Sequence, residues 1–452
     1  MVDFRHARRA GILLHLTSLP SARFDDDCLR WLDFMHEAGL SVWQMLPLVI
    51  PDAHGSPYQS RSAFAANPRL LPANDQPVAQ SDLDEYCAKH ADWLDDYAIF
   101  EVLRRRFGSQ SWTDWPDAYR HRDEKTLRET RASAQVEIHH IFDQQYRLDR
   151  AWQRIRTHAQ GLGIHLFGDV PIFIAHDSAD TWSRPDCFLL DDAGQPTYVT
   201  GVPPDYFAEF GQRWGNPHYH WERMREDGFS WWLARMQRQF ELFDLVRIDH
   251  FRGLVAVWMI EASCDTAVDG HWEATPGDQL LSVLKQRFPE MPIVAEDLGV
   301  ITEEVRQLKR KYELPGMSVL QFAFDHFEDN PHKPANITEQ CIAYTGTHDN
   351  DTCVGWFNTL QPHERDFVFE TLRVAPTEAI APLMIETAMH SRAALAVAPL
   401  QDFLGLDSSA RMNTPGVTDG NWRWRFSWDM LDNGLAKEIN KMVQASGRLH
   451  AG

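Results

Sequence analysis

The sequence predicts an α/β protein that folds as a (β/α)8 TIM barrel with insertion subdomains after the second and third strands. Three observations carry this prediction. Eight short apolar runs of strand length recur along the chain, helical or insertion segments separate them, and unusual polar side chains follow several of the runs. The carboxyl ends of all barrel strands meet at one face, so these polar positions would converge there.

The length fits one such barrel. The chain has 452 residues, and a single barrel fills about 200 to more than 400 residues when its loops carry insertions. We therefore expect residues 1–452 to form a single catalytic barrel domain. Insertions at about 50–162 and 175–243 would form subdomains around the face where barrels place their active sites.

The chain begins with a βαβ unit. Residues 11–16, GILLHL, and 42–48, VWQMLPL, have the apolar character of buried strands. Between them, residues 28–38 show a partly helical apolar face that ends just before Gly39. Parallel strands need such a crossover, which usually contains a helix.

Two long insertions follow. Residues 51–77 are rich in Pro, Ser, Ala and Asn and are predicted to form an ordered loop. Helices are expected at 83–106 and 124–160, the second with apolar residues near 3.6-residue spacing. A third strand and its exit are expected at 164–174, and residues 176–221 are predicted as an irregular insertion.

Predicted strands and helices then alternate again up to the end of the chain. A helix containing residues 229–240 precedes the fourth strand at 244–251. The remaining predicted strands are 293–298, 319–324, 342–349 and 395–404.

Polar residues gather at the ends of these strands, as an active site in a barrel requires. They are Asp169, Arg247, Asp249, Glu296, His348, Asp349, Gln401 and Asp402. Each alone could be a satisfied polar group or a helix cap, and Asp169 and Asp402 individually favour that structural interpretation. Together they favour one site.

The stretch 244–253, DLVRIDHFRG, shows both possibilities at once. Arg247 and Asp249 are two residues apart, so in a strand they point to the same side and can form an ion pair. Such a pair can be structural, or the cation can keep a catalytic carboxylate ionised. The two interpretations are compatible.

Three carboxylates around one cavity suit a retaining glycosidase-type displacement. Asp249 would be the nucleophile, and Glu296, at an apolar strand end near other carboxylates, would have a raised pKa and act as acid/base. Asp349 would bind sugar hydroxyls and favour an oxocarbenium-like ring, and His348 would donate to a hydroxyl.

Two other functions compete. Metal-dependent hydrolysis could use His250, His348, Asp349 and Asp351 as ligands, but no H-x-H or H-E-x-x-H spacing is present. A glucan-binding or scaffolding protein on the same fold would be expected to have lost one of the three carboxylates. Gly-rich phosphate-binding motifs are absent.

Composition narrows the partners and the compartment. With 44 Lys and Arg against 65 Asp and Glu, the formal net charge of −21 disfavours nucleic acid, anionic membranes and phosphorylated substrates. Seventeen Trp and 25 Phe offer faces that can stack on sugars. The six cysteines make no C-x-x-C pair, which indicates free thiols. The apolar run near the amino terminus is too short to span a membrane, so the cytoplasm is the expected location.

Ordered sequence blocks along nearly the whole chain reveal a resemblance. The chain closely resembles the 4-alpha-glucanotransferases called amylomaltases or disproportionating enzymes, a branch of the alpha-amylase clan of glycoside hydrolases. The matching blocks are GILLHLTSLP, SPYQSRSAFAANP, FGDVPIFIAHDSADTW, GVPPDYFAEFGQRWGNP, VRIDHFRG, PIVAEDLGVIT, PGMSVLQFAF, YTGTHDNDT, PLQDFLGLDSSARMNTPG and GNWRWR.

The resemblance implies specific roles. Asp249 matches the family's nucleophile, Glu296 its acid/base and Asp349 its transition-state-stabilising aspartate. The residues that match substrate-binding positions are Tyr58, Asp169, Asp205, Trp214, Arg247, His348, Phe322 and Asn413. Residues 205–215 resemble a flexible lid over the cleft.

The activity implied is transfer of an alpha-1,4-glucan segment to the 4-hydroxyl of glucose or another glucan. The partners would be maltooligosaccharides and glucose, with no metal and no organic cofactor. The chain departs from the family's sequence pattern at two places in the expected cleft wall. Ser21 to Asp27 replace the family's Gly-rich, tyrosine-bearing turn after Pro20, and Gly55 stands where an acidic residue is common.

Overall fold

A closed ring of parallel strands forms the centre of the computed structural model, which describes residues 8–73, 77–204, 209–376 and 379–449. The strands run in the order β10-β11-β12-β1-β2-β3-β6-β9, and all neighbouring pairs are parallel. The N–H of Ala295 in β9 donates to the carbonyl of Pro315, beside β10, at 2.9 Å and closes the ring. The predicted (β/α)8 barrel is confirmed.

The eight barrel strands are short and buried. Their bounds are β1 Arg9–Leu13, β2 Val42–Gln44, β3 His165–Val170, β6 Leu245–Ile248, β9 Ile293–Ala295, β10 Gly316–Val319, β11 Cys341–Tyr344 and β12 Leu395–Pro399. Nearly all of their side chains are buried, because a parallel sheet is covered on both faces. Gly168 in β3 leaves room for Phe243, whose ring would lie 2.3 Å from an added Cβ.

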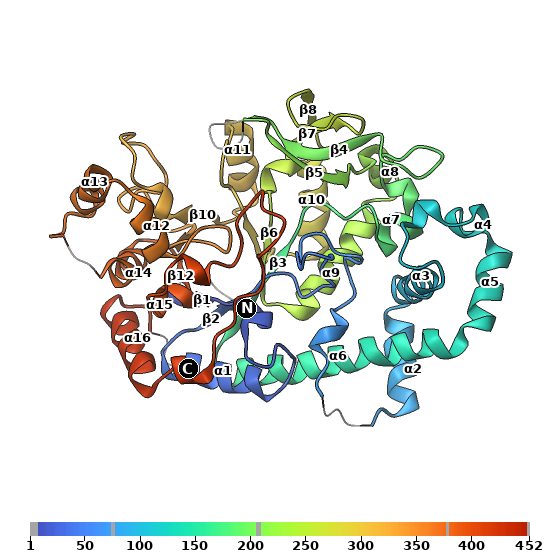
Figure 1. Cartoon of the computed structure of the whole chain (residues 1–452), viewed down its shortest axis with the longest axis horizontal. Coiled ribbons are helices and arrows are strands. Elements are labelled where there is room, and N and C mark those ends of the chain that lie inside the picture. The colour runs from blue at the N-terminus through green and yellow to red at the C-terminus, as the bar shows by residue number, and fades with distance from the viewer. Residues whose placement is uncertain (1–7, 74–76, 205–208, 377–378, 450–452) are drawn as a thin grey trace.

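Helices surround the barrel and build the insertions (Figure 1). Their bounds are α1 Asp26–Glu37, α2 Gln80–Lys89, α3 Leu94–Arg106, α4 Asp117–Arg120, α5 Glu124–Ser133, α6 Gln135–Gly161, α7 Ala179–Ser183, α8 Trp221–Glu226, α9 Ser230–Leu242, α10 Gly277–Arg287, α11 Glu303–Lys311, α12 Cys353–Thr359, α13 Pro362–Leu372, α14 Ile380–His390, α15 Leu400–Phe403 and α16 Asn433–Ala445.

Between β2 and β3 the described residues form the α-helices α2 to α6, of which α6 is the longest at 27 residues. The two helices predicted here, 83–106 and 124–160, are each broken in two. The first breaks because Trp93 turns inward and stacks on Phe64, with ring centroids 5.9 Å apart. The second breaks at Ala134, which is buried and leaves the helical conformation (φ −112°, ψ 23°).

A second, antiparallel sheet lies above the barrel in Figure 1, in the order β5-β4-β7-β8. Its strands are β4 Tyr198–Val202, β5 Gln212–Pro217, β7 Ala256–Glu261 and β8 Gly270–Ala274. The prediction that 176–221 is irregular is therefore wrong for β4 and β5. The β7–β8 hairpin, between β6 and α10, was not predicted at all.

Most predicted strands were extended past their observed carboxyl ends, and two of them enter helical turns. The sixth was expected at 319–324, but β10 covers Gly316–Val319 and Leu320–Phe322 forms a 3-10 turn. The eighth was expected to reach residue 404, but β12 ends at Pro399, which cannot donate to a further strand neighbour, and α15 begins immediately.

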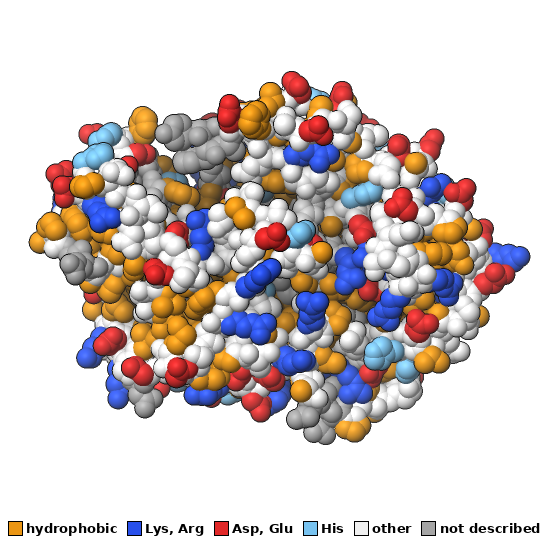
Figure 2. Space-filling model, viewed as in Figure 1, with side chains coloured by type: hydrophobic (Ala, Val, Ile, Leu, Met, Phe, Trp, Pro, Cys, Tyr) orange, Lys and Arg blue, Asp and Glu red, His pale blue; other side chains and the backbone are white. Residues whose placement is uncertain are grey.

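The barrel lacks one of its usual covering helices. After β10 the chain runs through the 3-10 turn and then through turns and irregular backbone over 323–340 to β11, without a helix. Among the described segments, no helix is long and apolar enough to cross a membrane. Acidic and basic side chains are interspersed over the face shown in Figure 2.

Candidate active site

The side chain of Arg247 connects the polar residues at the ends of β3 and β6. Its Nε and Nη2 donate to the two carboxylate oxygens of Asp169 at 2.9 and 2.7 Å, and Nη2 also donates to Asp249 Oδ1 at 2.9 Å and to the Tyr58 hydroxyl at 3.2 Å. Asp169 and Arg247 are direct partners in the β3–β6 register. The predicted Arg247–Asp249 ion pair is confirmed, and Asp169 is a second partner.

Arg247 is shared, and this affects the charge of Asp249. Burial at the floor of the site raises the pKa of Asp249, and the carboxylates of Asp169, Glu296 and Asp349 add to the rise. Arg247 lowers that pKa but does not cancel the rise, because it also neutralises Asp169. Arg247 thus favours the ionised form of Asp249, as expected, but burial and the neighbouring carboxylates oppose it. The Asp249 side chain remains 31% exposed, so solvent moderates the effect of burial.

Glu296 immediately follows β9 and is held by the backbone on both carboxylate oxygens. The N–H of His250 donates to Oε2 at 2.7 Å and that of Leu298 to Oε1 at 2.9 Å. Burial raises the pKa of Glu296 to about 7, and the anion of Asp297 adds to the rise, whereas Arg247 and the two N–H groups oppose it. The predicted upward shift is confirmed.

His250 reaches Glu296 through an unusual backbone conformation. Its φ is 50°, in the left-handed region that non-glycine residues seldom occupy. Its imidazole ring meets the edge of Trp214 on β5, with centroids 4.9 Å apart. Strained backbone of this kind clusters at functional sites, and here it directs an N–H to a carboxylate.

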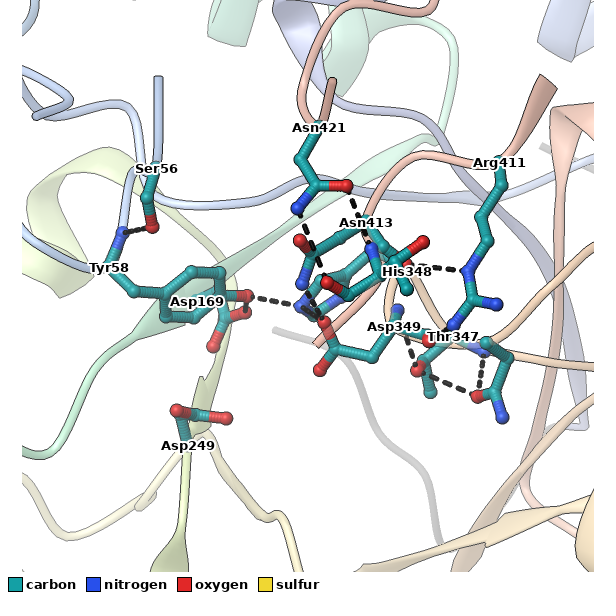
Figure 3. Close-up of polar contacts among 12 residues, drawn as sticks. Ser56, Tyr58, Asp169, Asp249, Thr347, His348, Asp349, Arg411, Asn413 and Asn421 are labelled. Atoms are coloured by element: carbon teal, nitrogen blue, oxygen red, sulfur yellow. Dashed lines mark hydrogen bonds and ion pairs between the residues drawn. The ribbon is translucent and has the colours of Figure 1, made fainter. Parts of the chain in front are cut away.

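The other wall of the site is formed by the residues that follow β11 and by the segment that follows β12 (Figure 3). Asn413 donates through Nδ2 to Asp349 Oδ1 at 2.6 Å, and His348 Nε2 lies 3.4 Å from the same oxygen. Asn413 also donates its backbone N–H to the carbonyl of His348 at 3.1 Å. Burial lowers the pKa of His348, which favours the neutral imidazole, although Asp349 opposes the shift.

Tyr58 joins the two walls. Its hydroxyl donates to Asp169 Oδ2 at 2.6 Å and lies 2.8 Å from His348 Nε2. The ring stacks on the imidazole of His348, with centroids 5.3 Å apart and planes 13° apart. Figure 3 shows the ring of Tyr58 beside Asp169, with His348 and Asp349 beyond it. The long loop after β2 thus contributes directly to the site.

The structure also locates the other predicted residues. Phe322 lies on the 3-10 turn after β10, is 45% exposed and meets the edge of His332 at 5.6 Å. Trp214 packs against His250, and Asp205 lies outside the described residues. Asp402 serves the fold: it accepts from Thr345 Oγ1 at 2.6 Å and from the N–H of Cys353 at 2.7 Å.

Sequence reasoning passed over two residues of the wall. Arg411 donates to the carbonyls of Asp349 at 2.7 Å and Asn413 at 2.8 Å, and so ties them together. Trp422 has its ring 5.9 Å from that of Tyr58 and 6.0 Å from that of His348. Both lie in sequence blocks that carry the family resemblance, and that was the available signal.

The six cysteines are free thiols. The proposed metal ligands His250, His348, Asp349 and Asp351 do not come together as a set. Within the described ranges, no group of three or more His, Cys, Asp or Glu side chains is arranged to hold a metal ion. Asp351 instead accepts from the hydroxyl of Ser408 at 2.7 Å.

Comparison with known proteins gives consistent matches. A glycoside hydrolase family 77 model described as 4-alpha-glucanotransferase matches residues 14–80 and 71–431. A 4-alpha-glucanotransferase from Thermus thermophilus is 41% identical over an alignment of 498 positions, which covers 98% of this chain and 99% of that one. The chloroplastic/amyloplastic 4-alpha-glucanotransferase of Solanum tuberosum is 39% identical. That alignment covers 99% of this chain and 88% of the potato protein.

Solved structures agree. An amylomaltase from Streptococcus agalactiae in complex with acarbose superposes with a TM-score of 0.94 at 30% identity, and the match covers 98% of this chain and all of that one. An amylomaltase from Corynebacterium glutamicum, at 16% identity and a TM-score of 0.78, shares the fold over 98% of this chain and 75% of its own.

Proposed function

The chain belongs to the 4-alpha-glucanotransferase family of glycoside hydrolases and has that family's activity, and from this premise we propose the mechanism and the residues that perform it. The enzyme transfers a segment of an alpha-1,4-glucan to the 4-hydroxyl of an acceptor glucose or glucan. It does so by retaining double displacement through a covalent glycosyl–Asp249 intermediate. One arrangement carries the proposal: Asp249 is ion-paired to Arg247, and Glu296, with its raised pKa, accepts the N–H of His250, the residue after Asp249.

In the first step an oxygen of Asp249 attacks the anomeric carbon, and the bond from that carbon to the glycosidic oxygen breaks. Glu296 gives its proton to this oxygen, so the leaving glucan departs with a free 4-hydroxyl. Arg247 stabilises the Asp249 carboxylate before attack, because it donates directly to one of its oxygens. A pKa of about 7 supplies Glu296 as an acid near neutral pH.

In the second step the 4-hydroxyl of the acceptor attacks the same carbon. Glu296, now ionised, takes the hydroxyl proton, and the bond to Asp249 breaks, which restores both carboxyl groups. Asp349, held by Asn413 and Arg411, binds sugar hydroxyls and favours the flattened, positively charged ring of both transition states. Water attacking in place of the acceptor would give hydrolysis as a side reaction.

Transfer requires that the intermediate be shielded from water until the acceptor arrives. We assign this role to the segment 205–215, whose described part includes Trp214 packed edge-on against His250. His348, Tyr58 and Trp422 provide the surface on which the donor sugar lies. The wholly free thiols favour a reducing compartment, and we propose the cytoplasm.

Incubation with maltotriose tests the activity. Free glucose with a ladder of longer maltooligosaccharides, resolved by thin-layer chromatography, is the expected result. Shortening alone would indicate a hydrolase, and unchanged maltotriose would indicate a binding protein. Acarbose, present in the Streptococcus agalactiae structure, should inhibit the reaction competitively. Activity that survives prolonged EDTA treatment would contradict the metal-dependent alternative.

Asp249→Asn tests the mechanism. The variant should lose several powers of ten in rate and still bind maltooligosaccharide, because it lacks only the covalent nucleophile. Asp82→Asn, an exposed substitution on α2, is the matched control and should keep full activity. Near-normal transfer by Asp249→Asn would overturn the assignment.

A further inference from the structure

A large groove lies where the barrel lacks its helix after β10. It runs between α11 and the segment 323–340, is open to solvent and has a cavity volume of about 880 Å³. This lies near the upper end of the ~300–1,000 Å³ that is usual for a ligand pocket. Its lining includes Arg306, Arg310, Phe322, Phe327, Asn330 and Arg392. Such a space suits an extended chain.

The groove runs along the outer wall of the barrel, from Phe322 after β10 to Gln340 and Arg392, which precede β11 and β12. Asp297, the residue after Glu296, lines it, pairs with Lys309 and accepts the N–H of Met317 at 2.7 Å. Phe322 lies at one end of the groove and is 45% exposed. Glu296 protonates the glycosidic oxygen, so the sugars beyond that oxygen, which belong to the leaving group or the acceptor, lie on its side of the cleft. A glucan that leaves the site on this side past Phe322 can therefore enter the groove.

Phe327 is an exposed aromatic on a well-held turn in the groove wall. Its side chain is 68% exposed, which is unusual for phenylalanine. Asp325 Oδ1 accepts its N–H at 3.1 Å. Asn330 donates to the carbonyl of Phe322 and to Asp325 Oδ2, both at 2.8 Å, and Asn336 donates to the carbonyl of Glu328 at 2.7 Å. The turn thus presents an apolar ring to solvent at a defined place.

The charges of the lining favour a neutral ligand. Four cationic side chains, Arg306, Lys309, Arg310 and Arg392, face four carboxylates, those of Asp297, Asp325, Asp329 and Glu339. An anion would gain no net attraction in a protein that carries a formal charge of −21. Planar polar side chains beside exposed aromatic rings instead match the hydroxyl edges and apolar faces of sugars.

We propose that this groove binds the reducing-end portion of long acceptor glucans, and that Phe327 stacks on a sugar ring beyond the one at Phe322. This inference rests on the proposed function. Phe327 sets the preference for acceptor length and takes no part in bond cleavage. Because the acceptor attacks with the 4-hydroxyl of its non-reducing end, its remaining sugars extend away from Glu296 into the groove.

Acceptor kinetics test the proposal. The donor is a maltotriosyl fluoride blocked at its non-reducing end, so that it cannot itself accept, and the acceptors are glucose and maltoheptaose. Phe327→Ala should raise KM for maltoheptaose roughly three- to tenfold, the loss of one stacking contact, and leave KM for glucose unchanged. Phe327→Trp should retain the wild-type KM, whereas Phe327→Leu, which keeps apolar area without a flat face, should resemble Phe327→Ala.

The experiment includes a control variant, and its outcomes distinguish failure of this inference from failure of the proposed function. Val136→Ala, at a side chain on α6 that is 84% exposed, should change neither KM. If Phe327→Ala changes both acceptors equally, or neither, the groove does not bind acceptor and this inference is overturned. If the wild-type enzyme transfers to neither acceptor, the proposed function itself fails. Concentration-dependent dimerisation abolished by Phe327→Ala would assign the groove to a second copy instead.

Discussion

Two aspartates at strand ends show how residue chemistry depends on the neighbours. Asp169 and Asp402 are both almost fully buried and both follow apolar runs. Asp169 meets a guanidinium and a phenol that open onto the cleft, whereas Asp402 meets a threonine hydroxyl and a backbone N–H. Local sequence could not separate them, because the deciding partners lie 78 and 57 residues away along the chain.

The positions of the three proposed catalytic carboxylates were easier to predict than the roles of Asp169 and Asp402. Asp249, Glu296 and Asp349 follow strands whose apolar character is clear, and the parallel barrel brings such ends to one face. The sharing of Arg247 between Asp169 and Asp249 was not predictable from the i, i+2 spacing alone, because the β3–β6 register sets it. Burial is the main cause of the raised pKa of Asp249, and the neighbouring Asp169 carboxylate, which shares Arg247, adds to the rise.

The raised pKa of Glu296 predicts a basic limb in the pH profile. The acid form of Glu296 is lost as pH rises through about 7, so kcat/KM should fall there. The Asp297 anion helps to raise this pKa, so Asp297→Asn should lower it and shift the limb to lower pH. Rates of transfer from maltotriose between pH 5 and 9 would measure the shift. An unmoved limb in Asp297→Asn, or one that moves upward, would contradict the assignment, and Asp278→Asn on the exposed end of α10 is the control.

The substitution Asp169→Asn should lower kcat without unfolding the protein. In Asp169→Asn one carboxylate of the Arg247 fork becomes neutral, so Arg247 and Tyr58 lose their fixed orientation. We expect kcat to fall by about 10²-fold, in line with a displaced positioning group. The acidic limb should move to lower pH, because Asp169 contributes to the raised pKa of Asp249. Unchanged kcat with an unshifted acidic limb would show that Asp169 acts in folding alone; circular dichroism checks the fold.

At the scale of elements, long apolar runs were predicted and polar strands were not. The segments of β5, QRWGNP, and β8, GHWEA, lack the apolar alternation that marks a strand. The first two residues of β5 and the last four of β8 are exposed. They exist because β4 and β7 offer them antiparallel partners. Strand ends were misplaced where an apolar run continued past the last ladder bond, as Leu320 does after β10.

The element that secures the end of the chain yields a stability prediction. Arg448, beyond α16, is fully buried and donates to the carbonyls of Met389, Ser391 and Ala393 and to that of Arg9 in β1. Burial, with Arg8 nearby, lowers its pKa to about 9. No carboxylate is needed, because the carbonyl oxygens at the end of α14 share the charge.

Arg448→Met should therefore destabilise the fold and spare catalysis. Met fills the space of the stem but leaves several buried carbonyls without a donor, each costing about 1–3 kcal/mol. We expect a total of roughly 3–5 kcal/mol, seen as a lower urea midpoint and a shorter half-life on heating. kcat at 25 °C should stay near wild type, since Arg448 contacts the amino end of β1. The exposed Arg128→Met on α5 should change neither, and equal stability of both variants would refute the anchoring role.

The whole molecule is a barrel whose site is assembled from segments far apart in sequence. Tyr58 comes from the loop after β2, Trp214 from the small sheet, and Asn413 from beyond β12. The alignment with the Thermus thermophilus relative has 498 positions, more than the 452 residues of this chain, so this chain carries deletions relative to it. The effect of the different turn after Pro20 on the cleft wall was beyond sequence reasoning, because the shape of a loop depends on what it packs against.

The net charge of the molecule yields the last prediction. A formal charge of −21 repels anions over about 30 Å at 0.01 M salt and over about 10 Å at 0.1 M, whereas a neutral sugar is unaffected. Maltose and its carboxylate derivative maltobionate differ as acceptors by that charge and by the opened terminal ring. With maltose, kcat/KM should be constant between 0.01 and 0.5 M NaCl, because the Arg247 ion pairs are buried. With maltobionate, kcat/KM at low salt should be several-fold below its high-salt value and should rise with salt until it levels off.

Any difference due to the opened ring would persist at all salt concentrations and so is separable from repulsion. A maltobionate rate that falls with salt would instead reveal a local cationic surface, such as the arginines of the groove, that outweighs the charge of the whole protein.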